Sequence, residues 1–142
     1  MLRVNYLLAF KTKSVWTISP EEPVLSAVQL MADKHIGALP VVREGELIGI
    51  VSERDYARKV ILLGRSSSDT PVWQIMSSPV RTVTPDDAVH RCMEIMTEQR
   101  IRHLPVLEKN RLVGMVSIGD LVKAVIEEQQ QTITQLERYI AG

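Results

Sequence analysis

The chain has 142 residues, 45% of them apolar, and its 17 Lys and Arg balance its 17 Asp and Glu. This apolar content excludes general disorder, and the balanced charge excludes bulk electrostatic attraction to nucleic acid or to an anionic membrane. A single cysteine excludes an internal disulfide, and no apolar run approaches the roughly eighteen residues of a membrane helix, so we expect a soluble cytoplasmic protein.

The sequence repeats itself once, at a period of about 65 residues. The segments that return pair as follows: residues 15–22 with 80–87, residues 35–42 with 100–107, and residues 47–55 with 112–120. Repeated units usually bury their apolar faces against each other, and a site on one unit has a counterpart on the other. Two copies therefore predict a pseudo-twofold arrangement with two related sites.

Each copy begins with a predicted strand and helix. The β-branched run 15–18 predicts a short strand, and the Ser-Pro-Glu-Glu segment after it predicts a helix start with Ser19 as the N-cap. The helix presents an apolar face over residues 24–31. In the second copy, Thr84 takes the place of Ser19, and residues 89–96 carry the equivalent face.

Each copy continues with a predicted hairpin and a second helix. In the first copy, the apolar runs 39–42 and 47–51 flank a Gly-containing turn, which predicts two antiparallel strands. The second copy turns at residues 108–111. Ser52 and Ser117 then open the second helix of each copy.

These signals divide the chain into four parts. They are a first repeat with its N-terminal segment at 1–64, a linker and lead-in at 65–79, a second repeat at 80–126, and a C-terminal helical extension at 127–142. The extension carries an apolar stripe formed by Ile133, Leu136 and Ile140. This stripe either packs on its own domain or contacts a partner subunit.

A Ser-x-x-Asp element stands at the start of the second helix in both copies, as Ser52 with Asp55 and as Ser117 with Asp120. One interpretation is a capping box, in which the Asp side chain bonds back to the N-cap residue. The other is a ligand site, because a helix N-terminus suits phosphate and a nearby carboxylate accepts both hydroxyls of a ribose. The local sequence leaves both interpretations open.

Together these motifs resemble the CBS domain: a Leu-Pro-Val strand, a strand with a central Gly that ends in Val-Ser, and an Asp three residues after the Ser. The tandem resembles a CBS pair, or Bateman module, over about residues 8–126. The resemblance implies an α/β (α+β) fold of two pseudo-twofold β-α-β-β-α repeats packed through small sheets, and homodimers formed through the outer helices. It also implies regulatory binding of an adenosine-containing ligand, such as AMP, ADP, ATP, NAD(H) or S-adenosylmethionine, with no required cofactor.

The resemblance further implies two nucleotide sites, each built from both repeats. The site around Asp120 would use these residues: Lys11, Trp16, Ile36, Gly37 and Ala38 near the adenine, and Arg102, His103, Ser117 and Gly119 near the ribose and phosphates. Met115 is a further candidate nucleotide-binding residue. The site around Asp55 would use Ser52, Arg54 and Arg58 near the ribose and phosphates, and Met76, Arg81, Ile101, Arg102 and His103 near the adenine.

The two sites are not expected to be equivalent. Arg54, Arg58 and Lys59 follow Ser52, whereas only Lys123 follows Ser117 over the matching stretch. These cations either bind phosphates or form an ordinary solvated helix face. On the first interpretation, the two sites have unequal affinities.

Other chemistries lack support. There is no phosphate-binding Gly-rich loop, the three histidines are scattered, and Cys92 lies on an apolar helix face where we expect it to be buried. Together with the resemblance, this implies a regulatory protein that is not an enzyme, whose output is either a separate protein target or the ligand binding itself. The alternative is a nucleotide-free structural or interaction module, and an enzyme acting on bound NAD has no visible acid–base pair to support it.

Overall fold

The computed structural model describes residues 1–11 and 15–142, and it divides into two compact units. One unit is Ser14–Arg81, and the other combines Met1–Lys13 with Thr82–Gly142. The spatial units therefore cut the chain differently from the sequence repeats, because the first residues of the chain pack with the second repeat.

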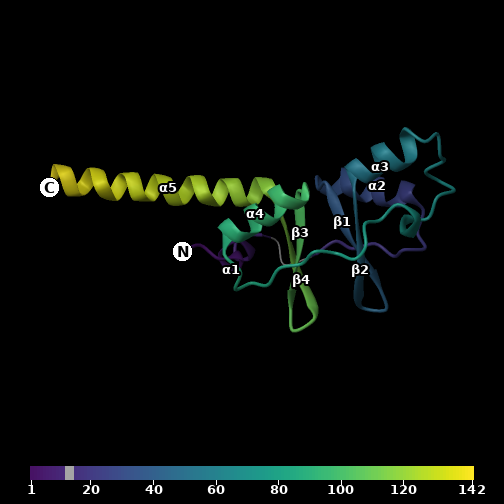
Figure 1. The fold of residues 1–142 in the computed structure, drawn as a ribbon, viewed down its shortest axis with the longest axis horizontal. Helices are drawn as coiled ribbons and strands as arrows, with labels where there is room; N and C mark the ends of the chain where they lie inside the picture. The colour runs from purple at the N-terminus through teal and green to yellow at the C-terminus, as the bar shows by residue number, and fades with distance from the viewer. Residues whose placement is uncertain (12–14) are drawn as a thin grey trace. The chain divides into compact units, whose positions relative to one another are not determined.

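The unit Ser14–Arg81 is built around one hairpin (Figure 1). Its elements are α2 (Val24–Lys34), β1 (Ala38–Arg43), β2 (Glu46–Ser52), α3 (Glu53–Tyr56), the π-helix η1 (Ala57–Ile61) and the 3₁₀ helix η2 (Val72–Gln74). The strands β1 and β2 are antiparallel, with Ala38 opposite Ser52. Glu44 and Gly45 both have positive φ, which makes the tight connection between the strands.

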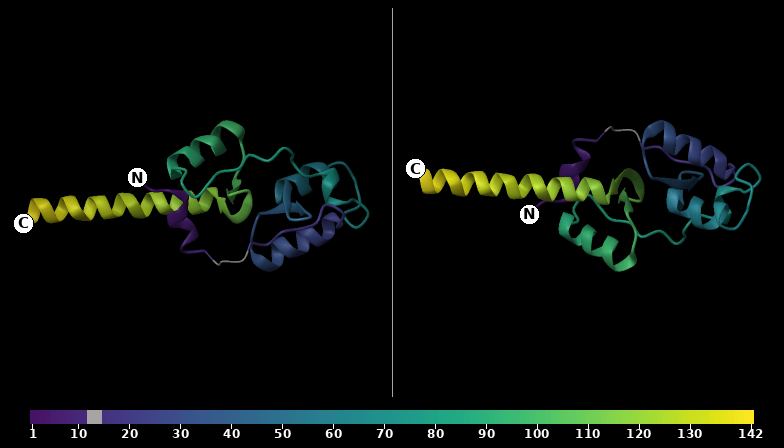
Figure 2. Two further views of the ribbon diagram at one scale, coloured as in Figure 1. Left: turned by 90° about the horizontal axis from the view of Figure 1, so that it is seen from below. Right: turned by 90° about the horizontal axis from the view of Figure 1, so that it is seen from above.

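The other unit has the same plan. Its elements are α1 (Val4–Leu8), α4 (Val89–Gln99), β3 (His103–Glu108), β4 (Arg111–Ser117) and α5 (Ile118–Ala141). The strands β3 and β4 pair in the same register as β1 and β2, with His103 opposite Ser117. The views in Figure 2 show α5 running on beyond the rest of its unit. The predicted mixed fold with two small sheets is confirmed.

The predicted first strand of each copy is reduced to one parallel bridge, which pairs Ile18 with Val41 in the first copy and Val83 with Val106 in the second. The Ile18 N–H donates to the Pro40 carbonyl at 3.0 Å. A proline follows two residues after each bridge, and because proline has no N–H the ladder cannot continue.

The predicted helix start at Ser19 is wrong. The helix α2 begins at Val24 with Pro23 as its N-cap, and residues 19–22 form a turn in which the Glu22 N–H donates to the Ser19 carbonyl at 3.2 Å. A proline disfavours helical backbone at the residue before it, so Glu22 cannot extend the helix toward Ser19.

The predicted start at Thr84 is wrong for a related reason. The helix α4 begins at Val89, and Ala88 is its N-cap. The Asp87 carboxylate accepts a 2.7 Å hydrogen bond from the Thr84 N–H, and the Asp87 N–H donates to the Thr84 carbonyl at 3.1 Å. This local bonding holds the segment as a turn in place of a first helical turn.

Each unit has its own apolar core. The core of Ser14–Arg81 is formed by Ile18, Val24, Ala27, Met31, Leu39, Val41, Val51, Val60, Val72 and Ile75. The core of the other unit is formed by Val4, Leu7, Val83, Val89, Cys92, Ile95, Met96, Leu104, Val106, Val116, Leu121 and Ala124. Cys92 is buried as expected, and burial raises the pKa of its thiol to about 11, so it stays protonated at neutral pH.

A segment that precedes one repeat in sequence packs on the hairpin of the other repeat. In the unit Ser14–Arg81, Met76 lies against Gly49, and Ile50 and Ser77 exchange backbone hydrogen bonds of 3.1 and 2.8 Å. In the other unit, the side chain of Leu8 lies against Gly114. A glycine stands at both positions because a Cβ atom there would collide with the packed side chain.

We expect Gly49→Ala to lower the free energy of unfolding by about 1–3 kcal/mol, as overpacking does. The new Cβ would meet the side chain of Met76 and lie 3.2 Å from the Ser77 carbonyl, which belongs to the backbone and cannot swing away. The matched change Gly114→Ala should cost less, because its three nearest atoms all belong to the Leu8 side chain. Urea unfolding measures both, and equal losses would contradict this account.

Candidate functional site

Both Ser-x-x-Asp elements form complete capping boxes. At the start of α5, the Ser117 N–H donates to Asp120 Oδ2 at 2.8 Å, and the Asp120 N–H donates to Ser117 Oγ at 3.2 Å. At the start of α3, the Ser52 N–H donates to Asp55 Oδ2 at 2.9 Å, and the Asp55 N–H donates to Ser52 Oγ at 3.2 Å. The capping interpretation is confirmed, and each carboxylate is thereby fixed beside a helix N-terminus.

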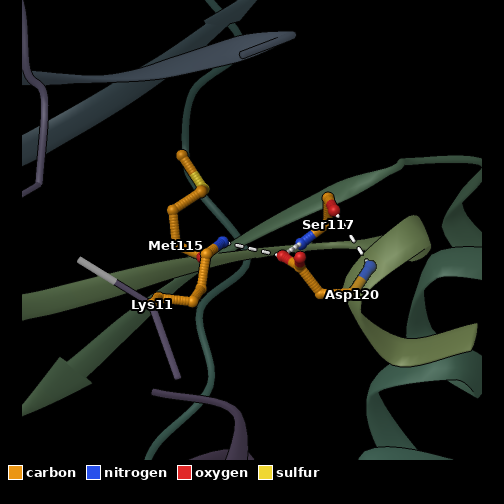
Figure 3. A network of polar contacts seen from close by, with 4 residues as sticks. All are labelled: Lys11, Met115, Ser117 and Asp120. Atoms are coloured by element: carbon orange, nitrogen blue, oxygen red, sulfur yellow. Dashed lines mark hydrogen bonds and ion pairs between the residues drawn. The ribbon is translucent and has the colours of Figure 1, made fainter. Parts of the chain in front are cut away.

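A lysine from the other end of the chain contacts the Asp120 carboxylate (Figure 3). Lys11 Nζ donates to Asp120 Oδ2 at 2.7 Å and to the Met115 carbonyl at 2.6 Å. The resemblance placed Lys11 in the site around Asp120, and Met115 was a further candidate residue; these two hydrogen bonds join all three residues. The side chains of Lys11 and Asp120 are 38% and 31% exposed, so the pair stays open to solvent.

These contacts determine the charge of Asp120. Burial alone would raise its pKa, but the hydrogen bonds from Lys11 and from the Ser117 backbone together outweigh burial, and the pKa lies below its usual value. Asp120 is therefore ionised at neutral pH and can accept hydrogen bonds from hydroxyl groups.

In the unit Ser14–Arg81, a different lysine contacts the equivalent carboxylate. Lys59 Nζ lies 3.1 Å from Asp55 Oδ1 and donates to the Ile75 carbonyl at 2.8 Å. The sequence left Lys59 as either a phosphate ligand or part of a solvated face, and the structure shows an ion pair. The signal was its position four residues after Asp55, where side chains on a helix meet.

The two copies therefore keep one lysine per carboxylate but take it from different positions. By the 65-residue period, Met76 occupies the position of Lys11, and Ala124, which is buried, occupies the position of Lys59. In each compact unit, therefore, a lysine at one of these two positions accompanies an apolar residue at the other.

The predicted strand entries lie against the helix starts of their own units. Ala38 stands opposite Ser52 in the sheet, and the Glu53 N–H donates to the Gly37 carbonyl at 3.0 Å. In the other unit the Ile118 N–H donates to the Arg102 carbonyl at 2.9 Å, so Arg102 and the adjacent His103 lie beside the start of α5. Backbone and side chains of these entries thus border each Ser–Asp pair.

The other predicted residues vary in exposure. Trp16 is partly exposed, and Lys34 Nζ lies 4.1 Å from the centre of its ring, a cation–π contact that the sequence analysis missed. Arg58 and Arg81 are exposed. The remaining positions are half-buried or lie in the first turn of a helix: Ile36, Arg54, Met76, Ile101 and Gly119.

A cavity of about 250 Å³ lies beside the Lys11–Asp120 pair. Its lining residues are Tyr6, Leu7, Phe10, Lys11, Asp120, Lys123, Ala124 and Glu127. The rings of Tyr6 and Phe10 meet edge to face with their centres 5.0 Å apart. The sequence analysis missed these aromatic residues, although their spacing of four is the one that places two side chains on one helical face.

Comparison with known proteins shows the family. The family model described as the CBS domain matches residues 9–62 and 72–127. The chain belongs to the CBS-domain family. It carries two CBS domains, a CBS pair, and this family is one of regulatory modules.

Individual relatives agree with this result. The CBS pair is 46% identical over 127 residues to the mitochondrial CBS domain-containing protein CBSX3 of Arabidopsis thaliana, covering 86% of this chain and 62% of that protein. It is 36% identical over 110 residues to the CBS domain-containing protein YhcV of Bacillus subtilis, covering 78% of each chain. A solved CBS-domain protein from Burkholderia ambifaria is 48% identical, with a TM-score of 0.87 over 90% of this chain and 96% of that one.

Two further observations concern the CBS pair over residues 1–11 and 15–142. None of the helices described there combines the length and the apolar character needed to cross a membrane. Within the same residues, His, Cys, Asp and Glu side chains do not gather in groups of three or more that could hold a metal ion.

We expect Lys11→Met, which copies the residue found at position 76, to raise the pKa of Asp120, because the ammonium hydrogen bond is lost. A carboxyl with a lowered pKa stabilises the fold above its unfolded pKa and loses that contribution as pH falls through the folded pKa. The variant should therefore lose roughly 0.5–1 kcal/mol at pH 7 and little at a pH below the folded pKa of Asp120. Carbon-detected NMR titration of the Asp120 carboxyl tests the first point, and an unchanged pKa would contradict it.

Proposed function

We propose that this CBS pair is a regulatory module that binds an adenosine-containing ligand and has no catalytic activity of its own. The candidate ligands are AMP, ADP, ATP, NAD(H) and S-adenosylmethionine. The observation that supports this proposal is the Asp120 carboxylate, which is ionised, partly exposed, beside a lysine ammonium and next to a cavity at the start of α5.

The chemistry of this position suits a nucleotide. An ionised carboxylate accepts charge-assisted hydrogen bonds from both hydroxyls of a ribose. The N-terminus of α5 is the start of a 24-residue helix, whose dipole favours phosphate. The Lys11 ammonium adds positive charge at the same place. We assign ribose to Asp120 and phosphate to the helix start around Ser117 and Gly119.

The equivalent position in the unit Ser14–Arg81 has the same design with a different cation. Asp55 would hold the ribose, with Ser52, Arg54 and Arg58 near the phosphates. Lys59 is fixed by both the Asp55 carboxylate and the Ile75 carbonyl. A ligand at Asp55 would therefore meet a carboxylate that is already neutralised by Lys59, four residues later in the chain. Asp120, in contrast, is neutralised by Lys11 from a separate segment.

Regulation would follow from differential affinity. A ligand shifts an equilibrium between two arrangements only by as much as it binds one of them more tightly. In this proposal the nucleotide stabilises one arrangement of a homodimer in the cytoplasm, and a separate protein target reads that arrangement. No required cofactor, nucleic acid or membrane enters the proposed mechanism.

A second candidate function has its own supporting observation. Both capping boxes are complete, so the Ser and Asp residues are already accounted for as helix caps. On this view the CBS pair is a nucleotide-free interaction module that regulates a partner through its surfaces.

We expect a thermal-shift panel of the candidate ligands, run on protein unfolded and refolded to remove bound ligand, to raise the Tm by several degrees for one or two of them. A ligand at about a hundred times its Kd adds roughly 2.7 kcal/mol to the stability of the folded state. Asp120→Ala should lose most of this rise because the ribose hydroxyls lose their acceptor.

The ligand-free Tm supplies the control. Loss of either cap costs about 1 kcal/mol, so Asp55→Ala and Asp120→Ala should both lower it by a similar amount. If both variants keep the full ligand-induced rise, or if no compound raises the Tm of the parent protein, the nucleotide proposal fails and the interaction module remains.

We also expect isothermal titration with the ligand that performs best to resolve two unequal sites per chain. The physical reason is the different origin of the two lysines, one on the same helix as its carboxylate and one on a distant segment. Asp120→Ala and Asp55→Ala should each remove a different one of the two sites. Two identical sites would contradict this prediction.

A further inference from the structure

The helix α5 carries an apolar stripe that no described part of its own unit covers. The exposed fractions of its members are 40% for Val122, 58% for Ile126, 47% for Ile133, 56% for Leu136 and 83% for Ile140. The buried residues of α5 are Leu121 and Ala124, which lie on another face. The interpretation that the stripe packs on its own domain is therefore wrong.

The stripe follows a seven-residue repeat. Ile126, Ile133 and Ile140 are spaced by seven residues, and so are Val122, Gln129 and Leu136, which stand four residues before them. These are the a and d positions of a coiled coil, with isoleucine at every a position. From Val122 to Ile140 the seam is about 28 Å long at the rise of an α-helix.

The outer part of α5 needs a partner to be stable as a helix. Figure 1 shows it extending beyond α1 and α4, and its residues 129–141 are rich in exposed side chains. An isolated helix of about 12–15 residues is marginal in water, and its stability in proteins comes from packing an apolar face. A second helix with a matching seam supplies that packing.

We infer that this stripe binds the same stripe of a second copy of the chain in an antiparallel two-helix coiled coil. When two copies are placed head to tail about a twofold axis, Ile133 faces Gln129 of the second copy, and Ile126 faces Leu136 of the second copy. In the same register Lys123 faces Glu137 of the second copy, and the twofold axis makes this opposite-charge pair occur twice.

The charges select the antiparallel orientation. In a parallel pair, the residues flanking the seam would place Glu137 beside Thr132 and Lys123 beside Ile118, so neither charge would meet an opposite one. The antiparallel pair satisfies both. Gln129 is the polar member of the seam, and a polar residue there lowers the stability of a coiled coil. We therefore expect a weak association, whose extent changes with protein concentration.

The test compares two glutamates on the same helix. Ile133→Glu places a charge in the seam, whereas Gln131→Glu places the same charge on the opposite side of α5. Sedimentation of the full chain over a concentration series should show the mass of the Ile133→Glu assembly at half that of the parent, whose chain mass is 16.0 kDa. Gln131→Glu should keep the parent mass. Equal masses for Ile133→Glu and the parent would overturn the inference.

A charge exchange tests the orientation. Lys123→Glu and Glu137→Lys should each weaken the association roughly tenfold, because each turns two attractive pairs into repulsive ones. The double variant restores opposite charges across the seam and should recover the parent affinity. Circular dichroism verifies that every variant is folded. A double variant that associates no better than the two single ones would overturn the antiparallel arrangement.

Discussion

Each unit depends on burying one face of a two-stranded hairpin, because a hairpin of this size is marginally stable alone in water. Helices cover one face in both units, and a distant segment then closes on the second strand. Met76 packs on Gly49 in one unit, and Leu8 packs on Gly114 in the other. This need for cover explains why the first residues of the chain belong to the same compact unit as the second repeat.

The packing of that segment also determines the electrostatics of the candidate site. The segment that packs Leu8 onto the sheet also carries Lys11, three residues after Leu8, and places it against Asp120. In the other unit the matching segment carries Met76, which packs on the sheet and has no charge. There the Asp55 carboxylate is neutralised by Lys59, four residues after it in the chain. A half-buried carboxylate needs a cation, and the two copies meet this need by different routes.

Features that depend on neighbours in sequence were predictable, and features that depend on distant contacts were not. The hairpins and the capping boxes follow from turns and a three-residue spacing, and all were confirmed. The start of α2 was misplaced because Ser19 with Glu22 fits a turn as well as a cap, and Pro23 decides between them. The Lys11–Asp120 pair joins residues 109 positions apart, which no local pattern shows. The family resemblance grouped them but did not reveal their contact.

The helix α5 links the candidate site to the assembly. Its first turn holds Asp120, and its outer half carries Ile133 and the rest of the seam, so both belong to one continuous helix of 24 residues. Binding equilibria at two places on one element are coupled whenever the paired and unpaired forms differ in ligand affinity, and the coupling is reciprocal. A nucleotide that bound the paired form more tightly would strengthen the pairing by the same factor. In the proposed mechanism, the position of Asp120 and the seam on a single helix provides a physical route from ligand binding to assembly.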